Sequence, residues 1–169
     1  MSNKPQPEEY VGFYAGYINI VGDEPVLDTL ENSKESTYTF LDSIDANKAD
    51  YAYAEGKWTI KEVVGHLIDA ERTFAYRILA FSRGQAELPG FDENEYVEKA
   101  TFKTRLFKDL AAEFRQLREA NLYLYRSLTT EQLMATGIAN GNTISVRALL
   151  YIAAGHELHH LNILKERYL

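Results

Sequence analysis

Residues 58–72 read Trp58-Thr59-Ile60-Lys61-Glu62-Val63-Val64-Gly65-His66-Leu67-Ile68-Asp69-Ala70-Glu71-Arg72, and they contain the clearest helix start in the chain. Thr59 and Glu62 have the spacing of a capping box, and Trp58 and Val63 have the spacing of the matching hydrophobic staple. A helix that begins here turns one stripe of side chains inward, which comprises Val63, His66, Leu67, Ala70, Phe74, Arg77 and Phe81. His66 is therefore expected among apolar neighbours.

Three further segments have the apolar spacing of amphipathic helices. They are residues 23–44, residues 101–128 and a last helix that begins near Thr143 or Ser145. The stretches between the helices are expected to be a connection at 45–57, a loop at 90–96 and a turn region at 133–143. Because no segment alternates convincingly like a strand, the pattern predicts an all-α fold, a four-helix bundle.

The chain length of 169 residues fits one domain. Residues 1–9 are expected to form a flexible polar arm, and residues 10–169 a single bundle domain. Within that domain, residues 10–20 are rich in aromatic side chains and are expected to be an N-terminal extension whose rings pack on the body.

The bulk composition excludes several classes of function. A net charge of −7 and a pI near 5.1 disfavour binding to nucleic acids or to anionic membranes. The absence of cysteine excludes disulfides, thiolate metal ligands and cysteine nucleophiles, and it fits a reducing compartment. With no apolar run at the start and no stretch of membrane-spanning length, we expect a cytoplasmic protein.

The four histidines are His66, alone in its helix, and His156, His159 and His160 near the end of the chain. His156 and His160 lie one helical turn apart on the same face, which suits two ligands of one ion. A third imidazole from His66 would complete a set with open positions, as in catalytic metal sites. His159 is rotated by about 100° from His160, so we expect it at the surface or beside a ligand. The alternative to a metal site is that His66 is buried and hydrogen-bonded to a neighbour, while the three later histidines lie at a partly solvated helix end.

The string from His156 to His160 also matches H-E-x-x-H, the signature of zinc proteases. Glu166 has the offset of a third protease ligand, but Ile163 stands where the chain would need a glycine to turn. On an unbroken helix Glu166 points away from His156 and His160, so the protease interpretation is disfavoured.

Several residues near the histidines have candidate supporting roles. Asp69, Glu157 and His159 could each hydrogen-bond to a metal ligand and orient it. Glu157, however, is expected to face solvent. Glu71 is expected to lie on an ordinary charged helix face. Arg77 could bind an anionic substrate group, but pairing with an acidic neighbour is the expected arrangement. Gly65 and Gly155 each precede a histidine in mid-helix, where glycine is unfavourable. We therefore expect the two helix backbones to approach closely there.

Three stretches in this order resemble the DinB/YfiT-like superfamily of small bacterial metalloproteins: residues 58–72, residues 90–96 and residues 155–161. The resemblance covers nearly the whole chain. It implies a four-helix bundle, often a homodimer, with a divalent ion held by His66, His156 and His160. Many relatives carry a glutamine where this chain has Ile163. Members similar to this chain are mostly named metal-dependent hydrolases, and some relatives are transferases or isomerases that use a low-molecular-weight thiol.

Three functional hypotheses follow from these observations. The first is a metal-dependent enzyme acting on a small molecule, either a hydrolase with Glu157 or Asp69 as general base or an S-transferase that uses a thiol. The second is a non-catalytic, metal-stabilised, stress-related binding protein, in which His159 or Asp69 closes the coordination sphere. The third is a structural domain without an ion. Zinc or nickel is the expected metal of the first two, with iron or manganese as alternatives.

Overall fold

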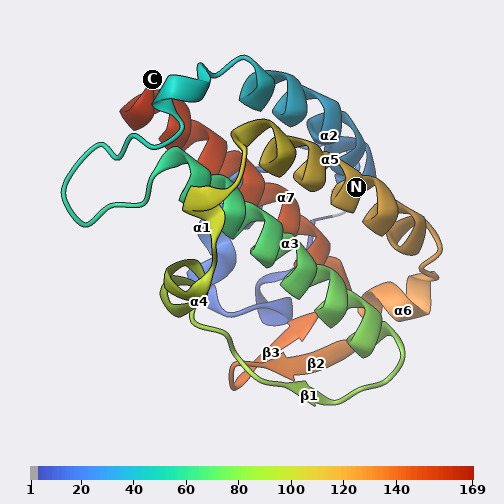
Figure 1. Cartoon of the computed structure of the whole chain (residues 1–169). Coiled ribbons are helices and arrows are strands. Elements are labelled where there is room, and N and C mark those ends of the chain that lie inside the picture. Colours follow the sequence, from blue (N-terminus) through green and yellow to red (C-terminus); the bar gives the residue numbers. More distant parts are fainter. Residues whose placement is uncertain (1–3) are drawn as a thin grey trace.

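The computed structural model describes residues 4–169, and four long helices form its body (Figure 1). They are α2 (Val26–Asp42), α3 (Ile60–Ser82), α5 (Phe107–Arg126) and α7 (Val146–Ile163). Both α2 and α3 pack against α5 and α7. The order around the bundle is therefore α2, α5, α3, α7, and the two consecutive helices α2 and α3 lie diagonally across it.

The helix starts agree with the sequence where a capping residue marks them. Thr59 caps α3 with the predicted capping box, and the Ser145 side chain accepts a hydrogen bond from the backbone N–H of Ala148 at the start of α7. The predicted start of α2 at residue 23 is three residues early, because Pro25 occupies the cap position. Helix α5 begins later than residue 101, because the chain first forms a 3₁₀ turn at Phe102–Thr104.

The prediction of a mostly helical four-helix bundle is confirmed, but a small sheet means that the fold is not strictly all-α. The sheet contains β1 (Glu87–Leu88), β2 (Thr136–Ala139) and β3 (Asn142–Ser145) in that order, with β1 parallel and β3 antiparallel to β2. The two-residue turn Asn140-Gly141 joins β2 to β3, and both residues have positive φ angles, of 52° and 73°. The predicted turn region is thus a hairpin, which lies at the end of the bundle remote from the C-terminus (Figure 1).

Among residues 4–169, three short α-helices accompany the long ones: α1 (Ala15–Ile20), α4 (Glu93–Lys99) and α6 (Thr130–Met134). The prediction of a loop at 90–96 is wrong in its second half, because Asp92 caps α4 by accepting hydrogen bonds from the N–H groups of Asn94 and Glu95. Helix α1 packs on α7, as expected for an extension that covers the body. Of the predicted N-terminal arm, residues 1–3 lie outside the described part of the chain.

The apolar core is divided into two clusters along the bundle axis. One contains Leu30, Ala70, Leu122 and Ala154, and the other contains Leu41, Ile68, Phe114 and Leu161. Each long helix thus contributes to both clusters, and on α2, α5 and α7 the buried polar residues lie between the two apolar stretches. Across residues 4–169, none of the helices combines the length and the apolar character needed to traverse a bilayer.

Candidate metal centre

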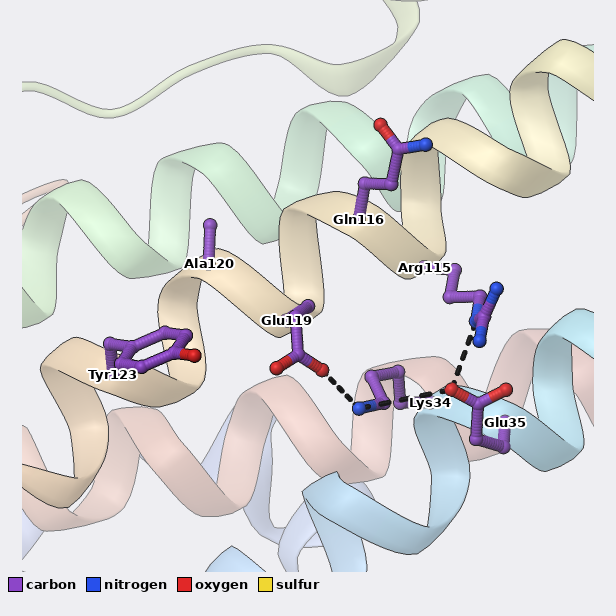
Figure 2. Close-up of a pocket in the computed structure, with 7 residues that line it drawn as sticks. All are labelled: Lys34, Glu35, Arg115, Gln116, Glu119, Ala120 and Tyr123. Carbon is purple, nitrogen blue, oxygen red and sulfur yellow. Dashed lines mark hydrogen bonds and ion pairs between the residues drawn. The ribbon is translucent and has the colours of Figure 1, made fainter.

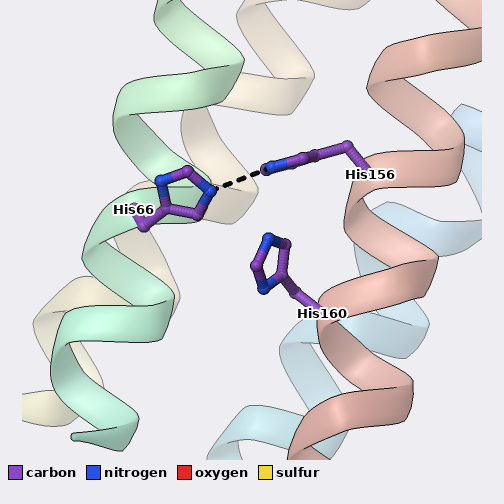
Figure 3. A group of neighbouring side chains, drawn as sticks. All are labelled: His66, His156 and His160. Atoms are coloured by element: carbon purple, nitrogen blue, oxygen red, sulfur yellow. Dashed lines mark hydrogen bonds between the residues drawn. The ribbon is translucent and has the colours of Figure 1, made fainter. Parts of the chain in front are cut away.

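The neighbouring helices α3 and α7 bring three histidines together. The cap at Thr59 fixes the start of α3, so that His66 lies on the second turn and on the face toward α7. The cap at Ser145 fixes α7 in the same way and turns His156 and His160 toward α3. Figure 3 shows His66 opposite the two imidazoles of α7, which lie one above the other.

The geometry of the three imidazoles suits a single small ion. One ring nitrogen of each residue can be chosen so that all three lie within 4.8 Å of one another. The Nε2 atoms of His66 and His156 are 2.9 Å apart. Nitrogen ligands of a tetrahedral zinc ion lie about 3.4 Å apart, so small side-chain rotations would suffice to coordinate one. Among the described residues, no fourth histidine, aspartate or glutamate joins this group.

Aromatic rings surround the three imidazoles. The ring centroid of Trp58 is 4.9 Å from that of His66, and the rings of Phe74 and Tyr17 are each 5.5 Å from His156. His66 and His156 are 5% and 7% exposed, whereas His160 is half-buried. The site is therefore closed on its inner side and accessible beside His160.

Burial keeps the imidazoles uncharged. It lowers the pKa of His66 from 6.5 to about 4. Burial, together with the neighbouring His66 and His159, lowers the pKa of His160 to about 3. The pKa of His156 also lies well below 6.5, first because of burial and then because of the other three histidines. Neutral imidazole has the free lone pair that a metal ligand needs, so the donor set fits a divalent ion.

A hollow of about 240 Å³ opens at His160. Its walls are largely aromatic and aliphatic, and its rim includes Lys57 and Asn94. The wall residues are Tyr53, Trp58, Val63, Ile163 and Tyr168. A small molecule in this hollow would lie against the exposed side of the histidine group.

The sequence pattern that defines the DinB superfamily matches residues 29–164, from α2 to the end of α7. This chain belongs to the DinB superfamily. Among proteins similar to it is one from Oceanobacillus iheyensis named "Putative metal-dependent hydrolase OB0413". The two are 28% identical over 128 residues, which cover 74% of this chain and 73% of that protein.

Two solved structures from Bacillus subtilis share the fold. YfiT, described as "a probable metal-dependent hydrolase with an unusual four-helix bundle topology", superposes with a TM-score of 0.71 and 21% identity, over 96% of this chain and 90% of YfiT. The DinB-like protein YjoA gives a TM-score of 0.59 and 23% identity, over 83% of this chain and 86% of YjoA.

The three proposed supporting residues have different surroundings in this DinB-superfamily chain. The carboxylate of Asp69 lies 3.7 Å from the Arg72 guanidinium, and burial raises its pKa. His159 is half-buried beside Tyr17, with ring centroids 5.3 Å apart, and is not part of the ligand group. Glu157 is 1% exposed, so the expectation that it faces solvent is wrong.

Glu157 belongs to a buried ionic network centred on Arg118. The guanidinium of Arg118 donates two hydrogen bonds of 2.9 Å to Glu71 and one of 2.8 Å to Glu157. The hydroxyl groups of Ser33 and Thr37 also donate to Glu157. Glu71 is 3% exposed, which contradicts its assignment to an ordinary charged face. Sequence reasoning missed Arg118 altogether, although a charged residue in the apolar stripe of α5 was a usable signal.

The glycines and Arg77 also differ from expectation. An added Cβ at Gly65 would overlap the Phe102 ring, and one at Gly155 would overlap the Tyr17 carbonyl group. Gly65 therefore leaves room for the Phe102 ring, and Gly155 leaves room for the backbone at Tyr17. The predicted close approach of the α3 and α7 backbones is thus not the reason for these glycines.

Within residues 4–169, Arg77 has no acidic partner within ion-pair distance, contrary to the expected pairing.

A larger hollow, of about 640 Å³, lies between α2 and α5, and the two carboxylates that line it, Glu35 and Glu119, are both paired with cations. Figure 2 shows its charged side chains engaged with one another: Lys34 pairs with Glu119 and Glu35, and Arg115 pairs with Glu35. None of the three histidines lines it. The hollow at His160 is therefore the better candidate for a substrate site.

Proposed function

We propose that this chain is a divalent-metal-dependent enzyme whose metal ligands are His66, His156 and His160. The observation that carries the proposal is a buried group of three neutral imidazoles with a hollow beside it. When bound, a divalent ion would supply Lewis acidity, which lowers the pKa of a water or thiol brought to it. Zinc or nickel is the expected metal, because imidazole suits both.

The chain's own residues would position and shield the reacting groups. Trp58 and Tyr168 form aromatic walls against which the body of a small substrate can pack, and they keep bulk water from the inner side. Lys57 and Asn94 at the rim offer polar groups to a substrate that enters beside His160. This arrangement favours an enzyme over a metal-stabilised binding protein, because a structural ion usually has four protein ligands.

Two nucleophiles are compatible with the site. The name of the Oceanobacillus protein favours water and a hydrolase. A hydrolase of the expected kind would use Glu157 or Asp69 as general base, but Glu157 is bound to Arg118 and Asp69 lies beside Arg72. An S-transferase that uses a low-molecular-weight thiol needs neither carboxylate as base, and this observation supports it as the second candidate. The homodimer implied by the family resemblance stays a prediction.

Metal analysis of the untagged protein tests the proposal. We expect purified wild-type protein, supplied with zinc or nickel, to retain about one ion per chain. His66→Ala should lose most of that metal because it removes one ligand of three. His159→Ala, on the helix α7 that carries His156 and His160, is the matched control and should retain it. Wild-type protein that retains no metal, or equal loss in both variants, would refute the assignment.

The metal-loaded protein then distinguishes the two nucleophiles. The release of nitrophenolate from a nitrophenyl ester measures hydrolysis, and the conjugation of cysteine to chlorodinitrobenzene measures thiol transfer. A rate that rises with cysteine and falls in His66→Ala would support the S-transferase. A rate of ester cleavage that is independent of cysteine and equally sensitive to His66→Ala would support the hydrolase.

A further inference from the structure

Arg77 is a buried cation to which residues 4–169 supply no counter-charge. It is 4% exposed and lies on α3 about 16 Å along the helix from His66. One of its Nη atoms donates to the carbonyl oxygen of Pro89 at 3.3 Å, and its guanidinium lies 5.8 Å from the centroid of the Phe91 ring. Within residues 4–169, no carboxylate lies within ion-pair distance of it.

This arrangement is energetically costly in the absence of an anion. Burial lowers the pKa of Arg77, and the neighbouring Tyr14 hydroxyl only partly opposes that effect. Buried charges in proteins are usually paired, because an unpaired one loses its hydration without compensation. The buried Arg118 shows the usual solution in this chain, since it is bound to two carboxylates.

Two hollows meet at Arg77, and both include Phe91. The first, of about 350 Å³, is also lined by Glu93, whose negative charge would repel an anion. The second, of about 300 Å³, has no carboxylate in its lining. Its other arginine, Arg72, is already paired with Glu113, so Arg77 is the cation that an anion there would neutralise. An anion that neutralises Arg77 would therefore enter the second hollow.

The walls of the second hollow indicate what kind of anion fits. Tyr76 and Tyr96 line it together with Phe91, and their side chains are 55% and 48% exposed. The rings of Phe91 and Tyr96 are in contact, with centroids 5.3 Å apart. Aromatic side chains around a cation suit a ligand with an apolar body and one acidic group.

We propose that the hollow formed by Arg77, Tyr76, Phe91 and Tyr96 binds a small organic carboxylate with an aromatic or apolar body. The planar guanidinium can donate two parallel hydrogen bonds to a carboxylate, and the rings pack against the body. This site contains none of the three histidines, so it does not depend on the proposed metal chemistry.

Binding of phenylacetate to the full-length protein tests the site. The Nε–H resonance of Arg77, followed by NMR, should shift saturably with phenylacetate and little with the neutral phenylacetamide. Inorganic phosphate should bind more weakly, because it lacks the apolar body. A site that prefers phosphate, or an Arg77 resonance that does not respond to phenylacetate, would overturn the proposal.

Variants separate the role of the charge from that of the fold. Arg77→Gln should weaken phenylacetate binding by about ten- to a hundredfold, because a hydrogen-bonded charge is lost. Tyr76→Ala, at an exposed position, should weaken it by about three- to tenfold through loss of the aromatic wall. Arg83→Gln, which removes an exposed positive charge just after α3 and outside both hollows, is the matched control and should leave the affinity unchanged.

Thermal unfolding of each variant shows whether it remains folded. If Arg77→Gln does not fold, Tyr76→Ala decides the question together with the NMR response of wild-type Arg77. Unchanged phenylacetate affinity in a folded Tyr76→Ala protein would contradict the proposed pocket.

Discussion

At the scale of single residues, the low pKa values of the buried histidines predict an acid-sensitive protein. In the folded, metal-free chain the pKa is about 4 for His66 and about 3 for His160, whereas 6.5 is the ordinary value. The unfolded chain therefore binds more protons below pH 6.5, and the free energy of unfolding falls as the pH decreases from there toward 4. Urea denaturation of metal-free protein at a series of pH values measures this slope.

His66→Gln is the control for this effect, because it removes one of the titrating groups. The dependence of the free energy of unfolding on pH should become shallower between pH 6.5 and 4 in this variant. An identical dependence in both proteins would contradict the assignment of the acid sensitivity to the histidine group.

The histidine group was predictable at the residue scale because its pattern is local. Two of its members lie one turn apart on one helix, and the capping box fixes the inner face of the other helix. The roles of Glu71 and Glu157 were not predictable in this way. Their partner Arg118 is 47 and 39 residues away in sequence, and only the packed bundle brings the three together. A charged side chain looks the same in sequence whether its partner is water or a buried arginine.

At the scale of elements, the docking of α1 on α7 depends on Gly155. A methyl group at this position would overlap the carbonyl group of Tyr17, which is backbone and cannot rotate away. Gly155→Ala should therefore push α1 off α7 and lower the free energy of unfolding by about 1–3 kcal/mol. It should also separate the Tyr17 ring from His156. Urea denaturation and tyrosine fluorescence measure the two effects.

Gly16→Ala is the matched control, since Gly16 is a helical glycine of α1 itself. An added Cβ there meets no atom within 4 Å. Alanine is the better helix former, so this variant should be as stable as wild type or more stable by about 0.5–1 kcal/mol. If both alanine variants behaved alike, steric overlap at Gly155 would not be the cause.

The elements that sequence analysis missed are short and depend on distant partners. The strands β2 and β3 have four residues each, and the residues of β1 pair with residues of β2 that lie 51 positions later in the chain. Asn140-Gly141 is a local hairpin signal, but the residues around it have little periodicity, so only a turn was predicted there. Asp92 was likewise a local capping signal for α4. The long helices were predictable because their apolar period repeats over many turns.

At the scale of the whole molecule, a polar layer crosses the bundle between its two apolar clusters. Arg118 of α5 binds Glu71 of α3 and Glu157 of α7, and it also donates to the Ser33 hydroxyl of α2. All four long helices are thus joined at one level. Burial alone raises the pKa of Glu71, but the charge and hydrogen bonds of Arg118 outweigh it and keep the carboxylate ionised. Glu157 directly follows His156, so the layer also holds α7 in the register that its histidines need.

Arg118→Met tests this interpretation, because methionine fills the space but leaves two buried carboxylates without a cation. The free energy of unfolding should fall by about 3–5 kcal/mol, as for other broken buried ion pairs. Arg115→Met on the same helix breaks an exposed pair with Glu35 and should have little effect. Urea denaturation measures both.

If Arg118→Met does not fold, Glu157→Gln, which removes only one charge, should still be less stable than wild type and bind metal more weakly. Equal stability of the Arg115 and Arg118 variants would show that the layer does not hold the bundle together.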